Sequence, residues 1–171
     1  MGRDRQILQI VGYQNSGKTT LMERLISQSV TAGLAVGTIK HHGHGGVPTG
    51  DNSKDSSRHE QAGASVTAVE GAGTLRMSIH RKNWALTDIL AIYDTFNMDA
   101  ILIEGYKKEP YPKVVLLRTS EDRELLEKLS NIVCVIYWPA YRLDKPLEYP
   151  AFSIHDEAQY MEFLMTEIRG K

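Results

Sequence analysis

Apolar residues recur along the chain with two spacings, and together they predict alternating strands and helices. Short runs that are largely β-branched predict buried strands at 7–11, 34–40, 100–103, 113–118 and 132–138. Longer stretches with apolar residues at helical spacing predict helices at 17–32, 86–96, 121–129 and 156–168. Alternating strands and helices are typical of right-handed crossovers. The pattern therefore predicts a three-layer α/β fold, with helices on both faces of a mostly parallel sheet.

One part of the chain alternates with a period of two instead. Residues 65–69 and 74–80 alternate, and the turn-like stretch 70–73 separates them, so the sequence predicts an added β-hairpin. A hairpin has edges that must be paired or covered, and self-association is one way to cover them. The 171 residues contain no repeat, low-complexity tract or linker. We therefore expect residues 1–171 to form a single domain.

Composition narrows the possible partners. The formal net charge is −1, from 20 basic and 21 acidic residues, so bulk charge predicts neither a nucleic-acid nor a membrane partner. The single cysteine, Cys134, lies inside an apolar run, which predicts a small core residue in a reducing compartment. The apolar segment near the N-terminus is too short for a signal peptide, and no run reaches membrane-spanning length. We therefore expect a cytoplasmic protein.

The strongest chemical motif is the stretch 12–20, Gly-Tyr-Gln-Asn-Ser-Gly-Lys-Thr-Thr, which fits the G-x-x-x-x-G-K-[ST] phosphate loop, or Walker A motif. It lies between a predicted strand and a predicted helix, as this motif requires. Main-chain N–H groups at a helix N-terminus supply the inward-facing donors that a polyphosphate needs. The motif therefore predicts a P-loop NTPase-like fold and a nucleotide site formed by Gly12, Asn15, Ser16, Gly17, Lys18, Thr19 and Thr20.

Two groups carry the predicted chemistry of this site. Lys18 has the reach and charge to contact the β- and γ-phosphates, and the Thr19 hydroxyl suits a phosphate-bridging Mg²⁺. Glu104 follows a buried strand, where a carboxylate can bind the metal through water or orient the attacking water. Asp99 begins that strand and should lie at the far end of the sheet. The candidate catalytic residues are Lys18 and Glu104, and the candidate metal ligands are Thr19 and Glu104.

A polar, glycine-rich segment at 41–59 follows the second predicted strand and should emerge at the same sheet edge. Its histidines His41, His42 and His44 are candidate metal ligands, but anion or substrate contact and a simply solvated loop are each favoured over metal binding. The candidate members of a second anion or cofactor site are Lys40, His41, His44, Lys54, Asp55, Arg58 and Lys107. A further loop at 139–146 is a candidate base-binding loop by position.

The motifs also occur in a familiar order. They are the phosphate loop 12–20, Ile-Lys-His at 39–41 with His44, Asp51 with Lys-Asp-Ser at 54–56, Ala-Gly-Ala at 62–64, Ile-Glu-Gly-Tyr-Lys at 103–107, and Lys-Val-Val-Leu at 113–116. This order resembles the MobB family, the adaptor proteins of molybdopterin-guanine dinucleotide biosynthesis. The resemblance covers nearly the whole chain. Near 137–139 the chain departs from the Ala-Ser-Asp that some family members carry.

The resemblance implies a homodimer that binds GTP and Mg²⁺ and hydrolyses GTP weakly. Members of the family assist the MobA guanylyltransferase, which joins GMP to molybdopterin, so MobA and molybdopterin-bearing enzymes are the implied partners. Guanine preference comes from the resemblance alone, because the Asn-Lys-x-Asp signature of regulatory GTPases is absent. The residues leave two alternatives open: a small-molecule kinase whose His-rich loop closes over an acceptor, and a nucleotide sensor without chemistry.

Overall fold

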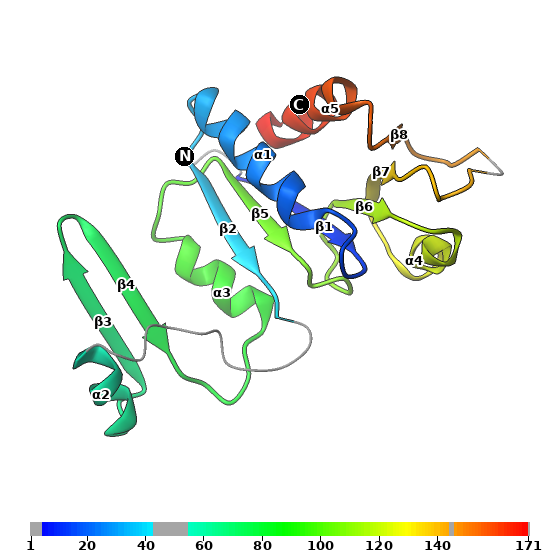
Figure 1. Ribbon diagram of the computed structural model, residues 1–171. Helices are drawn as coiled ribbons and strands as arrows, with labels where there is room; N and C mark the ends of the chain where they lie inside the picture. The colour runs from blue at the N-terminus through cyan, green and yellow to red at the C-terminus, as the bar shows by residue number, and fades with distance from the viewer. Residues whose placement is uncertain (1–4, 43–54, 144–145, 171) are drawn as a thin grey trace. The chain divides into compact units, whose positions relative to one another are not determined.

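The computed structural model describes residues 5–42, 55–143 and 146–170 (Figure 1). The chain separates into two compact units, which are described one at a time. The larger unit combines Met1–Gly43 with Ala91–Lys171, and the smaller unit is His44–Leu90. That residues 1–171 act as a single domain stays a prediction.

A six-stranded sheet forms the centre of the larger unit. Its strands are β1 (Gln6–Gly12), β2 (Val36–Lys40), β5 (Ala100–Glu104), β6 (Lys113–Leu117), β7 (Ile132–Tyr137) and β8 (Ala151–Ser153). Their order is β2-β5-β1-β6-β7-β8, and every neighbouring pair is parallel. The predicted parallel sheet is therefore confirmed. With β1 between β5 and β6, the carboxyl end of β1 meets the ends of two strands from distant parts of the chain.

Helices cover both faces of this sheet, as the pattern predicted. On one face α1 (Lys18–Thr31) and α5 (Glu157–Arg169) lie side by side, and their apolar residues pack with Ile10, Leu102 and Ile136 (Figure 1). On the other face Leu125 of α4 (Glu124–Lys128) packs with the alternate residues of the strands, whose side chains point to that face. The predicted helix at 121–129 is in fact a 3₁₀ turn, η1 (Ser120–Arg123), that continues into α4. A further helix, α3 (Leu86–Tyr93), spans the boundary between the two units in the sequence.

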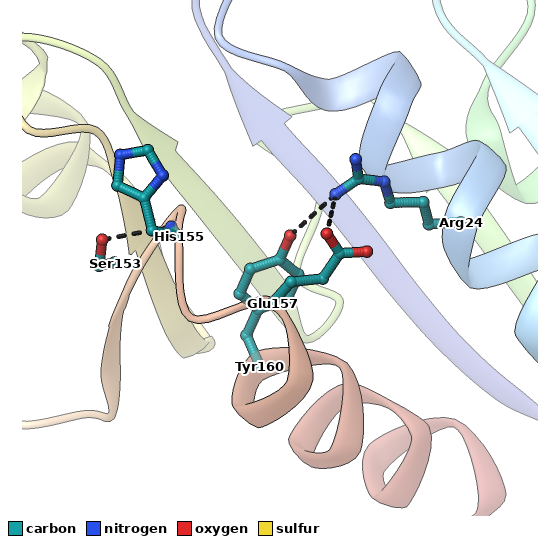
Figure 2. Close-up of polar contacts among 5 residues, drawn as sticks. All are labelled: Arg24, Ser153, His155, Glu157 and Tyr160. Atoms are coloured by element: carbon teal, nitrogen blue, oxygen red, sulfur yellow. Dashed lines mark hydrogen bonds and ion pairs between the residues drawn. The ribbon is translucent and has the colours of Figure 1, made fainter.

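The contact between α1 and α5 includes a polar group beside its buried apolar residues. Figure 2 shows Arg24 of α1 reaching across to the first turn of α5, where its Nη1 atom lies 2.6 Å from Glu157 Oε2 and 3.4 Å from the Tyr160 hydroxyl. Tyr160 is almost fully buried. Asp156 occupies the N-cap position of α5. In the turn before it, the His155 N–H donates to Ser153 Oγ at 3.3 Å (Figure 2).

The strand β8 was not predicted. It is three residues long and half-buried, and within the described residues it pairs only with β7. A segment this short contains too few positions to show a period of two. Its existence depends on the exposed edge of β7, which the local sequence does not reveal.

The smaller unit contains α2 (Asp55–Gln61) and the predicted hairpin, formed by β3 (Val66–Gly71) and β4 (Thr74–Ile79). Glu60 joins them, because its carboxylate accepts a hydrogen bond from Thr67 Oγ1 at 2.8 Å and lies 3.4 Å from His80 Nε2. Thr67 and its cross-strand partner Ser78 therefore point toward α2. The opposite face of the hairpin is mostly apolar and exposed, with Glu70 as its charged residue and Ile79 half-buried.

Cys134 is a core residue, as predicted. It is fully buried in β7, and burial raises the pKa of its thiol to about 12. A raised pKa means less of the reactive thiolate at any pH below it. We expect the folded protein at pH 8 to resist Ellman's reagent, and the same protein in denaturant to react at once. Fast labelling without denaturant would contradict this packing.

No helix within the described ranges is both long and apolar enough to cross a membrane.

Candidate functional site

The phosphate loop joins β1 directly to α1 at the middle of the sheet. Gly12 must be glycine, because an added Cβ would lie 2.5 Å from Ser16 Oγ and 2.9 Å from the Leu116 carbonyl oxygen. Gly17 has φ 98°, a conformation that glycine adopts without strain, and α1 starts at the next residue. The loop is therefore tightly turned, with Gly12 close to Ser16 and to Leu116 of β6, and it leads directly into the first turn of α1.

The interior of the loop contains a polar group without a protein partner. Ser16 is fully buried, and among the described residues no group hydrogen-bonds to its Oγ atom. A buried hydroxyl without a partner costs free energy unless a ligand or water satisfies it. Together with the main-chain N–H groups at the start of α1, it fits a bound phosphate.

Lys18, Thr19 and Glu104 converge on this loop. Lys18 Nζ donates to the Tyr13 carbonyl at 2.6 Å, and burial lowers the pKa of this lysine. Thr19 Oγ1 lies 3.4 Å from each oxygen of the Glu104 carboxylate. The register explains this meeting, because Ile10 of β1 pairs with Glu104 of β5. A threonine hydroxyl and a carboxylate are hard oxygen donors of the kind that Mg²⁺ prefers, so these two residues fit the implied metal.

Two more cations stand beside the same carboxylate and loop. Lys40 ends β2, pairs in register with Glu104, and places Nζ 3.3 Å from Glu104 Oε1. Lys107 Nζ lies 4.2 Å from the centre of the Tyr13 ring, and burial lowers the pKa of Lys107. Lys40 and Lys107 also lower the pKa of Lys18, by repulsion between like charges. Lys18 and Lys40 thus interact with the Glu104 carboxylate, whereas Lys107 lies beside the loop, where Asp122 and Glu124 attract it. Three ammonium groups close to the loop suit a polyphosphate.

The other predicted members of the second anion site fall in different places. The ring of His41 stacks at 4.4 Å on Tyr106, at the ends of β2 and β5. Asp55 and Arg58 belong to α2 in the smaller unit, and His44 and Lys54 lie outside the described residues. Within the described ranges, no group of three or more His, Cys, Asp or Glu side chains is placed to hold a metal ion. Since His44 is outside those ranges, metal binding by the histidines stays a prediction.

Two buried polar residues that the sequence analysis missed support the loop after Glu104. Gln9 is fully buried in β1, and its Nε2 donates to the carbonyls of Gly105 at 3.1 Å and Tyr106 at 2.8 Å. Lys113, its neighbour in β6, is also fully buried, and its Nζ donates to the carbonyls of Glu109 and Tyr111. Hydrogen bonds from Gln9 and Lys113 therefore fix the loop that contains Lys107 to the strands β1 and β6. A polar residue within a predicted buried strand was the signal that could have revealed it.

Gln9→Leu is expected to lower the free energy of unfolding by about 1–3 kcal/mol, because the Gly105 and Tyr106 carbonyls would lose their donor. We also expect weaker binding of a nucleotide at the phosphate loop, since the loop with Lys107 would no longer be held in place. Urea denaturation measures the first effect and calorimetry the second. Gln159→Leu, the same change at an exposed position of α5, should alter stability by less than about 0.5 kcal/mol. Equal effects of the two substitutions would rule out the supporting role of Gln9.

Two further side chains contact the phosphate loop from the ends of neighbouring strands. Arg118 follows β6, and its Nη1 donates to the Asn15 carbonyl at 3.4 Å. Trp138 follows β7, and its Nε1 donates to the Ser16 carbonyl at 2.9 Å. The sequence analysis gave neither residue a role. Both act on carbonyl groups, which every residue has, so no sequence motif marks the contact.

A strand, a glycine loop and a helix N-terminus, with Lys18 on the loop and Thr19 facing Glu104, define a P-loop nucleotide-binding protein. A match to a family model shows which family of P-loop proteins this chain belongs to. The family model described as "Molybdopterin guanine dinucleotide synthesis protein B", MobB, matches residues 7–138, and the chain belongs to this family. The resemblance seen in the sequence is therefore confirmed.

Individual relatives agree with this assignment. A Bacillus subtilis protein named "Probable molybdopterin-guanine dinucleotide biosynthesis adapter protein" is 43% identical over 166 residues, which cover 96% of this chain and 94% of the relative. The Haemophilus influenzae adapter protein is 34% identical, over 86% of this chain and 83% of the relative. The crystal structure of Bacillus subtilis MobB matches with a TM-score of 0.84 and 42% identity, covering 97% of this chain and 99% of that one. A MobB homologue from Bacillus stearothermophilus matches with a TM-score of 0.80 and 42% identity, covering 96% and 99%.

Proposed function

We propose that this protein is a GTP-binding adapter in the synthesis of molybdopterin guanine dinucleotide. The observation that carries the proposal is the convergence of Lys18, Thr19 and Glu104 on a phosphate loop, in a chain of the MobB family. The partners that follow from the family are a MobA-type guanylyltransferase and enzymes that use the finished cofactor. A cytoplasmic location fits such a role.

The site residues have different roles, which follow from their chemistry. The phosphate contacts fall to the N–H groups of the loop, with Gly12, Asn15, Ser16, Gly17 and Thr20 as the proposed contributors, and to the Lys18 ammonium group. Thr19 and Glu104 hold Mg²⁺, directly or through water, and the metal neutralises phosphate charge when bound. The surplus positive charge of Lys40 and Lys107 extends the site beyond the loop. There these two lysines serve as a second anion site, with His41 beside them.

Hydrolysis by this protein is proposed to be slow. Glu104 is the carboxylate that stands beside the loop and can orient a water molecule, but Lys40 lies 3.3 Å from it and competes for its oxygens. A carboxylate oxygen that contacts an ammonium group is less free to orient a water molecule. The protein then acts mainly through its bound nucleotide, as an adapter does.

Isothermal titration with GTP and ATP, each with and without Mg²⁺, tests the proposal. We expect GTP to bind more tightly than ATP, and Mg²⁺ to strengthen the binding of GTP. Should neither nucleotide bind in the presence of Mg²⁺, the proposed function is wrong. Tighter binding of ATP would contradict guanine preference but leave the phosphate site intact.

Phosphoryl transfer to a separate acceptor was the alternative that the sequence left open. The comparisons do not support it, because the relatives reported above bear adapter or MobB names. Nucleotide consumption that rises when a small-molecule acceptor is added would restore the kinase alternative.

A homodimer formed through the hairpin completes the proposal. Register places Val66 opposite Ile79 and Ala68 opposite Met77 on one face of the hairpin, and the side chains of Val66, Leu75 and Met77 are each more than half exposed. In the described part of the chain, the outer edges of β3 and β4 have no strand partner. An exposed apolar face with open edges suits pairing with a second copy.

Met77→Glu is expected to convert the dimer to a monomer, because it places a charge in the middle of the apolar face. Light scattering coupled to size-exclusion chromatography measures the mass. Arg76→Glu changes the other face of the same strand and should leave the dimer intact. A wild-type protein of monomeric mass at micromolar concentration would contradict the proposed dimer.

A further inference from the structure

Trp138 is held in place at both ends of its backbone. Its N–H donates to the Leu117 carbonyl at 2.9 Å, and its own carbonyl accepts a hydrogen bond from the Tyr141 N–H at 2.9 Å. The half-buried indole contacts the phosphate loop, where Nε1 donates to the Ser16 carbonyl at 2.9 Å. An added Cβ on Gly17 would lie 3.7 Å from Cζ2 of the same ring. Trp138 therefore donates to the loop from a fixed position after β7, and its ring lies on the side of Gly17 where a side chain would be.

The group that this contact orients is the peptide between Ser16 and Gly17. In a planar trans peptide, the carbonyl and the following N–H point in opposite directions. With the Ser16 carbonyl turned toward the indole, the Gly17 N–H is turned to the side away from Trp138. Glycine adopts positive and negative φ angles about equally well, so the φ of 98° at Gly17 is not fixed by the residue itself. A contact from outside the loop can fix it.

We infer that Trp138 is a positioning residue of the phosphate site: its indole N–H holds the Ser16–Gly17 peptide so that the Gly17 N–H faces a bound phosphate. The inference rests on the proposed nucleotide-binding function and adds to it a residue 122 positions away from Ser16. A loop that is already in its bound conformation loses less entropy when the ligand arrives. Trp138 thus raises affinity without touching the phosphate.

An aromatic ring beside a nucleotide site has another way to raise affinity, because it can stack on the base. The two roles differ in the ligand part that they affect. Tripolyphosphate has the phosphate chain of GTP and no base. A positioning residue therefore acts equally on GTP and tripolyphosphate, whereas a stacking residue acts on GTP alone.

The experiment titrates GTP and tripolyphosphate, each with Mg²⁺, into the full-length protein and its Trp138→Phe variant. The substitution keeps an aromatic ring and removes the N–H donor. Both affinities are expected to fall by the same factor, about three- to tenfold. The melting temperature without ligand should change by less than about 3 °C. Trp84→Phe, the same change at the other tryptophan, should leave both affinities as they are.

Three results would overturn the inference. A loss confined to GTP would assign the ring to the base, and unchanged affinities for both ligands would remove Trp138 from the site. A wild-type protein that binds neither ligand would remove the proposed function together with this inference. The first two results leave the proposed function intact, so the failures are distinguishable.

A second measurement keeps the inference testable if Trp138→Phe does not fold. In the Trp84→Phe protein, Trp138 is the remaining tryptophan, and its emission reports directly on the phosphate loop. We expect tripolyphosphate with Mg²⁺ to change this emission. Constant emission, while calorimetry detects binding, would show that the indole does not sense the phosphate.

Discussion

Lys18→Ala is expected to lower the affinity for GTP by at least about 100-fold, because it removes the one ammonium group that reaches into the phosphate loop from α1. The fold should persist. Among the described residues, the Lys18 ammonium group donates a hydrogen bond to the Tyr13 carbonyl of the loop, and burial, with repulsion from Lys107 and Lys40, lowers its pKa. Alanine is also a better helix former at the start of α1. Calorimetry with GTP and Mg²⁺ measures the loss, and thermal unfolding monitors the fold.

Lys108→Ala is the matched control for this substitution. Lys108 is an exposed lysine of the loop after β5, next in sequence to Lys107. Its loss removes the same formal charge from the same side of the sheet, so it should weaken GTP binding only slightly, through long-range attraction. Unchanged GTP affinity in Lys18→Ala would refute the proposed phosphate site.

Glu104→Gln is expected to abolish most of the Mg²⁺-dependent gain in GTP affinity, and to slow single-turnover release of phosphate because the bound metal is lost. The amide keeps the size of the side chain and loses its charge. Without that charge, Lys40 and Lys18 act on the nucleotide unopposed. In the absence of Mg²⁺, GTP should therefore bind to the variant at least as tightly as to the wild type. The opposite signs of the two effects distinguish a metal ligand from a general contributor to stability.

The comparison is calorimetry with and without Mg²⁺ on the wild type, Glu104→Gln and Glu162→Gln, which makes the same change at an exposed position of α5. Glu162→Gln should match the wild type in both conditions. Equal loss of GTP affinity with and without Mg²⁺ in Glu104→Gln would remove this residue from the metal site. An unchanged rate of phosphate release would remove it from hydrolysis.

The phosphate loop was predictable because its chemistry is local. The strand 7–11, the glycines of the loop and the helix from Lys18 follow one another directly, so a short stretch of sequence contains the whole motif. The hairpin was predictable for the same reason, since its two strands are adjacent in the chain. Glu104 was found because a carboxylate directly after a buried strand is itself a local pattern.

The supporting contacts were not predictable, because they join distant parts of the chain through groups that have no sequence pattern. Gln9 holds carbonyls 96 and 97 positions away, and Trp138 holds one 122 positions away. A glutamine within an apolar strand and a tryptophan after another strand each fit several roles. Which role applies depends on the strand order, which is decided by packing of the whole sheet.

The sequence alone thus determined the parallel α/β fold, the phosphate loop, the carboxylate opposite it and the family. Each of these follows from residues close together in the chain or from the order of such motifs. The tertiary structure alone decided that β1 lies between β5 and β6, and this position brings Lys40, Glu104 and Lys107 to one loop. It also decided that the loop is held by Gln9 and Trp138. The reason is physical: side-chain chemistry and backbone preference act over a few residues, whereas a site is assembled by strands that meet only after the core has packed.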